Sequence, residues 1–240
     1  MKEVVTPYKD QSGKKEQVEK MFNAISPRYD FLNQLLSLGI HHRWRKKAVK
    51  LFKEDKPKLI LDIATGTADF AIETAKINPE KIIGIDISEG MLDFGRIKLS
   101  KRKLQNKIIL EKGDAENMIF DSETFDVITV AFGVRNFENL SLGLSNMHKV
   151  LKTGGKVVIL EFSKPKGLFR YLYNFYFRYI TPLLGKFFSK DNSAYTYLPE
   201  SVSAFPDGNE FIQIMQTAGF KNTTYRELTF GVATIYTGIK

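Results

Sequence analysis

Apolar residues in the first 55 positions recur every three or four residues, which is the spacing of amphipathic helices. Two apolar stripes follow this spacing, one formed by Val18, Met21, Phe22 and Ile25, the other, after Pro27, by Phe31, Leu32, Leu35 and Leu36. A third helix is expected from about residue 42 to residue 52. The pattern therefore predicts a helical segment over residues 1–55.

From residue 58 onward, short apolar runs alternate with helical patterns, as in a parallel sheet covered by helices. Strands are expected at 58–63, 81–86, 108–110, 125–130 and 156–161, with helices at 69–77, 141–151 and 208–218 between or after them. Ser88 is expected to cap a further helix that carries Met91. Two final strands, at about 221–229 and 232–239, meet at Gly231 like a hairpin. These elements predict an α/β fold with an open, doubly wound sheet of seven strands and an antiparallel last strand.

The chain shows no internal repeat and no low-complexity linker, and 240 residues suit a single domain. We expect a helical cap at 1–55 and a core made of 56–163 and 207–240. Between the two core segments, residues 164–206 form a predicted helical insertion rich in aromatic, lysine and arginine residues.

Composition narrows the possible chemistry. The chain has no cysteine, which excludes disulfides, thiolate metal sites and a cysteine nucleophile, and we expect no bound metal. Residues 1–20 are polar and no apolar run approaches the ~20 residues that span a bilayer. We therefore expect a cytoplasmic protein, or one held at the inner membrane surface. A net charge of +9 favours anionic partners such as nucleic acid, phospholipid or an acidic small molecule.

Three predicted loops lie where ligands bind in such sheets, at the carboxyl ends of the strands. They are 62–69 after the first strand, Asp86 at the end of the second, and 113–116 after the third. Asp86 is suited to accept both hydroxyls of a ribose, and Asp114 to accept an adenine amino group. The candidate cofactor-binding residues are Asp62, Gly66, Thr67, Asp69, Asp86, Ile87, Met91, Asp114 and Ala115. Taken singly, each loop could be a plain turn or helix cap, but their combination at the right positions is much more specific.

A dinucleotide-binding domain is the main alternative for this pattern. That fold needs G-x-G-x-x-G for close approach of a pyrophosphate, whereas the first loop has only Gly66, flanked by Ala64 and Ala68. Carboxylates at Asp62 and Asp69 would repel a pyrophosphate, but either could pair with the ammonium of a methionine moiety. The loop therefore favours S-adenosylmethionine as the cofactor.

Three further stretches carry a family resemblance. They are Tyr29-Asp30-Phe31-Leu32-Asn33 followed by Ser37, His41 and Trp44, then Phe132-Gly133-Val134-Arg135-Asn136, and finally residues 149–155 with 160–163. Together they resemble the ubiquinone/menaquinone biosynthesis C-methyltransferase family from about Lys14 to the C-terminus, although Leu32, Ala131 and Thr153 depart from its usual residues. The resemblance implies a class I methyltransferase fold and methylation of a ring carbon of a prenylated quinol. It is greatest for members that convert demethylmenaquinol to menaquinol, with a 2-methoxy-6-polyprenyl-1,4-benzoquinol as the alternative substrate.

The resemblance also implies catalytic candidates. Ionising a quinol hydroxyl makes the adjacent ring carbon nucleophilic, and a nearby cation or base would help. Arg135 could stabilise the phenolate or orient a water, with Asn136, Tyr29 and His41 as further candidates. The simpler alternatives are a structural salt bridge for Arg135 and helix packing for His41.

Other function classes fit less well. An RNA methyltransferase would suit the charge, but the fourth strand is followed by Ala-Phe-Gly-Val-Arg-Asn instead of Asn/Asp-Pro-Pro-aromatic, and no RNA-binding module is visible. We therefore expect no nucleic-acid partner. A cofactor-binding regulatory protein without activity is a second alternative. The aromatic and basic stretch at 168–180 suggests contact with an anionic membrane, or else packing on the sheet edge. The oligomeric state stays open, with a homodimer among the options.

Overall fold

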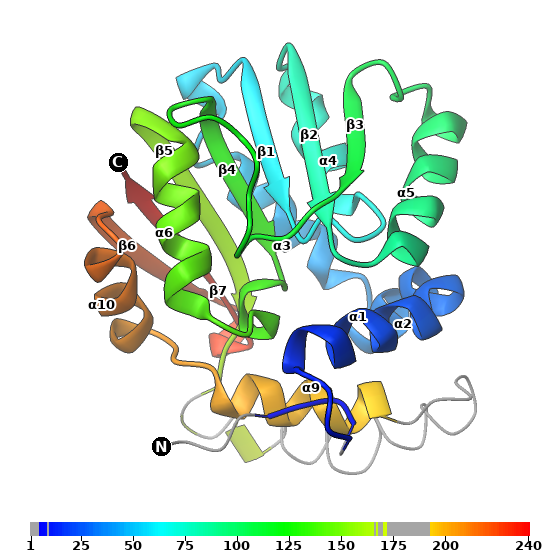
Figure 1. Ribbon diagram of the computed structural model, residues 1–240. Helices are drawn as coiled ribbons and strands as arrows, with labels where there is room; N and C mark the ends of the chain where they lie inside the picture. The colour runs from blue at the N-terminus through cyan, green and yellow to red at the C-terminus, as the bar shows by residue number, and fades with distance from the viewer. Residues whose placement is uncertain (1–4, 9, 166, 168–169, 172–192) are drawn as a thin grey trace.

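A computed structural model describes residues 5–8, 10–165, 167, 170–171 and 193–240. Its centre is a seven-stranded sheet in the order β3-β2-β1-β4-β5-β7-β6 (Figure 1). The strands are β1 (Leu59–Ile63), β2 (Lys81–Asp86), β3 (Ile108–Lys112), β4 (Phe125–Ala131), β5 (Leu151–Phe162), β6 (Lys221–Leu228) and β7 (Ala233–Ile239). Strands β1 to β5 pair in parallel, and β7 is antiparallel to both β5 and β6. The predicted seven-stranded sheet with an antiparallel last strand is confirmed.

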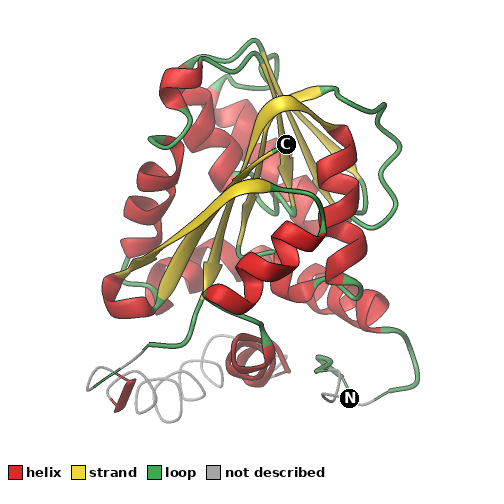
Figure 2. Ribbon diagram, turned by 90° about the vertical axis from the view of Figure 1, so that its left-hand side faces the viewer, coloured by secondary structure: helices red, strands yellow, loops and turns green. Residues whose placement is uncertain are grey.

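Helices cover both faces of the sheet (Figure 2). Alternate residues of a strand point to opposite faces, so Ile60 and Leu61 belong to two separate hydrophobic cores. The core around Ile60 includes residues of α3 (Ile40–Val49), α4 (Asp69–Thr74) and α5 (Glu89–Arg102). The core around Leu61 includes residues of α6 (Leu140–Val150) and α10 (Asn209–Thr217). This is the doubly wound arrangement that the alternating pattern predicts.

Strand β5 starts earlier than predicted. The sequence suggested residue 156, but pairing begins at Leu151 opposite Phe125, directly after α6 ends at Val150. The register then shifts across Gly154 and Gly155, and the φ of +80° at Gly154 favours glycine. The two glycines therefore form an irregularity inside a strand and not its start. Ser88 caps α5 as predicted, since its hydroxyl accepts a hydrogen bond from the Met91 amide.

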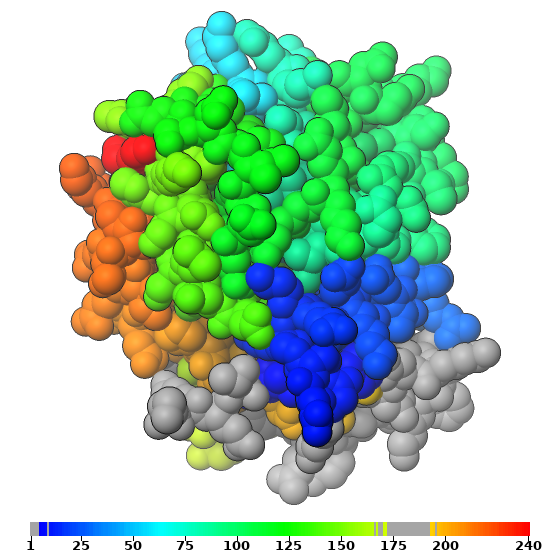
Figure 3. Space-filling model, viewed as in Figure 1, coloured from blue at the N-terminus to red at the C-terminus, as the bar shows by residue number. Residues whose placement is uncertain are grey.

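The N-terminal helices cross the carboxyl ends of the parallel strands. In Figure 1, α1 (Lys14–Ile25), α2 (Tyr29–Leu36) and α9 (Ser193–Ala204) lie together below these ends. Val18 and Met21 of α1 pack with Tyr197 of α9 in a small third core. In Figure 3, α1 and its neighbours, in blue, form a layer directly under the strand ends. Most of the predicted insertion lies outside the described residues, and its described end is α9.

Two features of the described part of the chain bear on function. No helix there is long and apolar enough to cross a membrane. No group of three or more histidine, aspartate or glutamate residues there is arranged to hold a metal ion.

Candidate functional site

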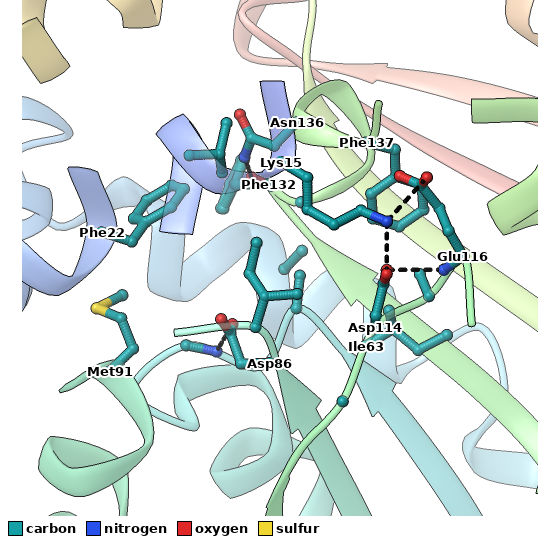
Figure 4. Close-up of a pocket in the computed structure, with 18 of the residues that line it drawn as sticks. Lys15, Phe22, Ile63, Asp86, Met91, Asp114, Glu116, Phe132, Asn136 and Phe137 are labelled. Atoms are coloured by element: carbon teal, nitrogen blue, oxygen red, sulfur yellow. Dashed lines mark hydrogen bonds and ion pairs between the residues drawn. The ribbon is translucent and has the colours of Figure 1, made fainter. Parts of the chain in front are cut away.

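The loops after β1, β2, β3 and β4 converge on one pocket below the sheet, which α1 closes from the other side (Figure 4). The loop after β1 has an unusual backbone, because Ala64, Gly66 and Ala68 all have positive φ, at 51°, 57° and 65°. For alanine this conformation is disfavoured by its Cβ, and such strain is concentrated at functional sites. The loop thus carries backbone strain where it meets the pocket.

Asp86 ends β2 and lines the pocket with a nearly buried carboxylate. Its Oδ2 accepts a hydrogen bond of 2.8 Å from the Gly66 amide, and its Oδ1 accepts one of 2.9 Å from the Ser88 amide. Burial raises the pKa of Asp86 to about 6, although these two backbone hydrogen bonds oppose the rise. Each oxygen keeps a lone pair, so the carboxylate can accept hydrogen bonds from two adjacent hydroxyls.

Asp114 lies after β3, at the other end of the pocket. Its Oδ1 accepts a hydrogen bond from the Glu116 amide, and its Oδ2 lies 2.7 Å from Nζ of Lys15 on α1. Lys15 also lies 3.3 Å from Oε2 of Glu116, so one cation of α1 bridges both carboxylates (Figure 4). The helical cap is therefore tied by charge to the loop after β3.

Asn136 and the apolar residues complete the lining. Asn136 follows β4, and its Oδ1 is buried without a hydrogen-bond partner among the described residues. Ile87, Met91 and Ala115 add apolar surface to the lining. A pocket with acidic acceptors at two points, an unpartnered amide oxygen and apolar walls fits a nucleoside-containing cofactor such as S-adenosylmethionine.

Three of the predicted cofactor-binding residues do not line this pocket. Asp62 is buried beneath the loop, where its carboxylate accepts hydrogen bonds from the hydroxyls of Thr65 (2.7 Å) and Thr129 (2.6 Å). Burial raises the pKa of Asp62 to about 6, against these two hydrogen bonds.

Thr67 and Asp69 point toward the N-terminal helices instead. The hydroxyl of Thr67 donates to Asp30, and Asp69 lies 2.7 Å from Nζ of Lys98 and 3.4 Å from Nη1 of Arg45. The loop therefore bounds the pocket, but three of its side chains stabilise the loop or join it to helices and do not line the pocket.

A second cavity of about 400 Å³ opens beside the first, between α1, α2, α3, α9 and the sheet. Its lining is mostly apolar and includes Met21, Ile25, Leu32, Leu36, Ile40, Trp44, Phe162, Leu198 and Val232. Phe22, Tyr29 and Phe132 line both cavities. The two cavities therefore meet at these three aromatic rings.

The four predicted catalytic residues each line at least one of the two cavities. Arg135, Tyr29 and His41 line the apolar cavity, and Asn136 lines the polar pocket. A structural salt bridge is the alternative role that the sequence predicts for Arg135. Such a salt bridge is present, with Nη1 of Arg135 2.8 Å from Oε1 of the fully buried Glu161. Its Nε has no hydrogen-bond partner in the described part of the chain. Arg135 is thus a structural ion and a cavity-lining cation at once.

His41 is a poor base at neutral pH. Burial and the nearby Arg45 lower the pKa of His41 to about 4, and Nδ1 of the ring is hydrogen-bonded to the Ser37 hydroxyl. The buried phenol of Tyr29 has a raised pKa, chiefly because of desolvation. Both side chains are therefore neutral at physiological pH.

The sequence profile of the ubiE/COQ5 methyltransferase family matches residues 10–240. The chain belongs to this family. As a ubiE/COQ5 methyltransferase, it is an S-adenosylmethionine-dependent enzyme.

Individual relatives agree with the family assignment. The demethylmenaquinone methyltransferase of Bacteroides fragilis is 48% identical over 240 residues, covering 99% of this chain and 98% of that protein. The ubiquinone/menaquinone biosynthesis C-methyltransferase UbiE of Geobacter sulfurreducens is 47% identical over 230 residues, covering 95% of this chain and 90% of that protein. A crystal structure of a Thermotoga maritima SAM-dependent methyltransferase, a possible histamine N-methyltransferase, superimposes with a TM-score of 0.63 at 18% identity, covering 92% and 99% of the two chains. That similarity shows that the ubiE/COQ5 methyltransferase has the same fold.

Sequence reasoning missed several lining residues of this ubiE/COQ5 methyltransferase. Phe22 was assigned only to an apolar stripe, and Lys15 and Arg45 were not singled out. Arg45 did carry a signal, because it stands four residues after His41 and three before Ala48, which places it on the buried face of the helix. No pattern marks Lys15, whose role depends on how α1 lies against the loop after β3.

Proposed function

We propose that this protein is a demethylmenaquinone methyltransferase that transfers a methyl group from S-adenosylmethionine to a ring carbon of demethylmenaquinol. The observation that carries the proposal is the meeting of a polar, nucleoside-type pocket with a mostly apolar cavity at Phe22, Tyr29 and Phe132. Methyl transfer needs donor and acceptor in contact, and most of its acceleration comes from their alignment. A prenylated bicyclic ring is the kind of acceptor that an apolar cavity lined by aromatic rings can hold. The near full-length similarity to the Bacteroides fragilis protein of that name supports the same substrate.

For the cofactor we propose six residues. Asp86 would accept the ribose hydroxyls, Asp114 the adenine amino group, and Gly66, Ile87, Met91 and Ala115 would contact it through backbone or apolar surface. When bound, S-adenosylmethionine supplies an electrophilic methyl group on a sulfonium. Asp62, Thr67 and Asp69 would act on the shape of the loop and not on the cofactor directly.

On the acceptor side, the protein must favour an electron-rich ring. Arg135 stays protonated at all physiological pH values, so it would stabilise the phenolate oxygen and not remove the proton itself. The neutral phenol of Tyr29 and the amide of Asn136 lie near the junction and can orient a hydroxyl or a water. His41, with its lowered pKa, would serve as a neutral hydrogen-bonding group.

Methyl transfer from labelled S-adenosylmethionine tests this function directly. Purified protein is incubated in parallel with a short-chain demethylmenaquinol, with a 2-methoxy-6-prenyl-1,4-benzoquinol and with tRNA. Label is expected in the naphthoquinol product. Label only in tRNA, or in no acceptor, would overturn the proposal, and label in both quinols would establish the dual activity suggested by the name of the Geobacter sulfurreducens relative.

We also propose that the protein is cytoplasmic and contacts anionic membranes peripherally, since its substrate is a lipid. Leu38 lines the apolar cavity and is 85% exposed, and the net charge is +9. Vesicles containing anionic lipid should cosediment with the protein, and neutral vesicles should do so much less. Equal, negligible cosedimentation with both would exclude this contact. A homodimer remains a prediction, which sedimentation velocity can test.

A further inference from the structure

Arg45 is a buried cation in the wall of the apolar cavity. It lies on α3 next to Trp44, and its side chain is 6% exposed. Burying a charge next to apolar surface is costly unless the charge is well paired. The completeness of its ion pairs and hydrogen bonds therefore indicates whether Arg45 has only a structural role or is also available to a ligand.

The pairing of Arg45 is incomplete. Its one ion pair with a described residue, Nη1 to Oδ2 of Asp69, is 3.4 Å long, and Asp69 is also bound by Nζ of Lys98 at 2.7 Å. Nε and Nη1 of Arg45 are buried and make no hydrogen bond to any described residue. Buried N–H groups without a hydrogen-bond acceptor are rare in proteins, so a bound ligand is a candidate acceptor for these two groups.

Arg45 and Arg135 flank one aromatic pair. The rings of Phe132 and Phe162 stack with centroids 4.4 Å apart. The guanidinium of Arg45 lies 5.8 Å from the centroid of Phe132, and that of Arg135 lies 5.4 Å from the centroid of Phe162. Each ring of the stack thus has one cation near it, and one of the two rings, Phe132, lies where the two cavities meet.

No carboxylate among the described residues lines the apolar cavity to offset these cations. Its titratable or charged lining groups come from α2, α3, the loop after β4 and α9, and they are Tyr29, His41, Arg45, Arg135 and Tyr197. The carboxylates that pair with the arginines, Asp69 and Glu161, do not line it. At neutral pH His41 and the two tyrosines carry no charge, so the lining is positive.

The phenol of Tyr29 experiences the positive charge of this lining. Burial raises the pKa of Tyr29. A hydrogen bond with Asn33 and the cations of Arg45 and Arg135 oppose the rise, and the carboxylate of Asp69 adds to it. Tyr29 lines both cavities, so its hydroxyl is a phenol held within the field of both arginines. A second phenol in the same cavity would experience that field too.

We propose that Arg45 is a second anion-stabilising residue of the substrate cavity, acting with Arg135 to favour the ionised form of the bound quinol hydroxyl. In this step the O–H bond breaks, its electron pair stays on oxygen, and the proton leaves to water, while both arginines remain protonated. The inference rests on the proposed function for the identity of the substrate. The competing role for Arg45 is purely structural, as a link between α3 and α4 through Asp69.

The ionisation of a bound naphthol tests the proposal without cofactor or turnover. The probe is 4-methoxy-1-naphthol, which cannot be oxidised to a quinone as readily as a quinol and whose absorbance changes when its hydroxyl ionises. Its pKa is measured free, bound to wild-type protein, and bound to Arg45→Met, Arg45→Lys and Arg43→Met. Arg43 is the matched control, because it is an exposed arginine on the same helix outside the cavity.

The bound probe should have the same pKa in the wild-type protein and in Arg43→Met. Arg45→Met should raise the bound pKa by about one unit, a tenfold change in the ionisation constant, and Arg45→Lys should restore most of the effect. Arg45→Met is expected to fold, because methionine fits an apolar wall and removes a poorly paired charge. An unchanged bound pKa in Arg45→Met, or no binding of the probe to wild-type protein, would overturn the proposal.

Turnover gives a second readout that separates this inference from the proposed function. If wild-type protein methylates demethylmenaquinol, the pH profile of kcat, which reports ionisations in the enzyme–substrate complex, should move to higher pH in Arg45→Met and stay in place in Arg43→Met. Quinol methylation by wild-type protein with no such movement would refute the role of Arg45 alone. Absence of quinol methylation by wild-type protein would refute the proposed function.

Discussion

Gly133, after β4, lies directly against Ala64, after β1. A Cβ built on Gly133 would stand 2.5 Å from the Cβ of Ala64, which no real pair of side chains tolerates. The two loops that bound the pocket can therefore approach this closely only because Gly133 has no side chain. Ala64 meanwhile holds a φ of 51°, a conformation that glycine adopts without strain.

We expect Gly133→Ala to destabilise the protein by about 1–3 kcal/mol through overpacking, and to weaken binding of S-adenosylhomocysteine. Removing the opposing methyl group in Ala64→Gly/Gly133→Ala should recover most of both losses. Ala64→Gly alone should change stability by less than about 1 kcal/mol, because relief of the positive φ offsets the entropy of the added glycine. Urea unfolding and titration calorimetry on the four proteins measure these effects. Additive losses in the double variant would mean that the two residues do not compete for space.

Asp62→Asn should stabilise the protein at pH 8. Burial raises the folded-state pKa of Asp62 to about 6, above the ordinary value of 3.8, so the stabilisation present below about pH 4 is lost as pH rises through 6. Asparagine stays neutral, so its variant does not lose stability as the pH rises. The hydroxyls of Thr65 and Thr129 can rotate to donate to its amide oxygen or accept from its amide nitrogen. The gain should reach up to about 3 kcal/mol at pH 8 and vanish near pH 4. Thermal unfolding between these pH values measures it.

The same variant tests the location of Asp62 outside the pocket. Its affinity for S-adenosylhomocysteine should fall much less than that of Asp86→Asn, which changes a carboxylate that lines the pocket. A larger loss in Asp62→Asn would show that Asp62 pairs with the cofactor after all.

The strand and helix pattern predicted the fold closely because both signals are local. Apolar residues recur every two positions in a strand and about every 3.6 positions in a helix when one face is buried. The boundaries between strands and helices therefore appear in the sequence where this spacing changes. The early start of β5 could not be predicted, since pairing of Leu151 with Phe125 depends on the neighbouring strand. Gly154 and Gly155 predict a turn before a strand, but in the structure they lie inside β5.

The candidate site was predictable as loops and less so as side chains. Position at the carboxyl end of a strand fixes where Asp86 and Asp114 lie, whereas Asp62 and Asp69 share the loop sequence but turn away from the pocket. Which side of a loop a carboxylate faces depends on three backbone positions with positive φ and on partners such as Thr65 in the loop and Thr129 on β4. The contributions of Lys15 and Arg45 depend on the packing of helices far away in sequence.

The salt bridge between Arg135 and Glu161 predicts a strong stability cost on breaking it. Arg135→Ala leaves the carboxylate of Glu161, which is 0% exposed, without its partner, and should cost about 3–5 kcal/mol. A loss of activity in that variant could therefore result from unfolding as well as from the loss of a catalytic group. Arg135→Lys keeps the charge, so it should retain most of the stability while losing more than tenfold in kcat, because lysine lacks the planar donor set. Chemical unfolding and steady-state kinetics at a temperature where all variants are folded separate the two effects.

Lys15 is expected to compete with the cofactor for Asp114. Its Nζ lies 2.7 Å from Oδ2 of Asp114, and both side chains are partly exposed, at 36% and 24%. A partly exposed ion pair is worth about 0.2–1 kcal/mol, so Lys15→Met should strengthen binding of S-adenosylhomocysteine by about threefold at low ionic strength, and less in high salt. Lys20→Met is the matched control, because Lys20 lies on the same helix with its closest carboxylate, Asp10, 3.8 Å away and outside the pocket. Weaker binding in Lys15→Met with no change in Lys20→Met would reverse the interpretation, since Lys15 would then contact the cofactor and α1 would form part of its binding site.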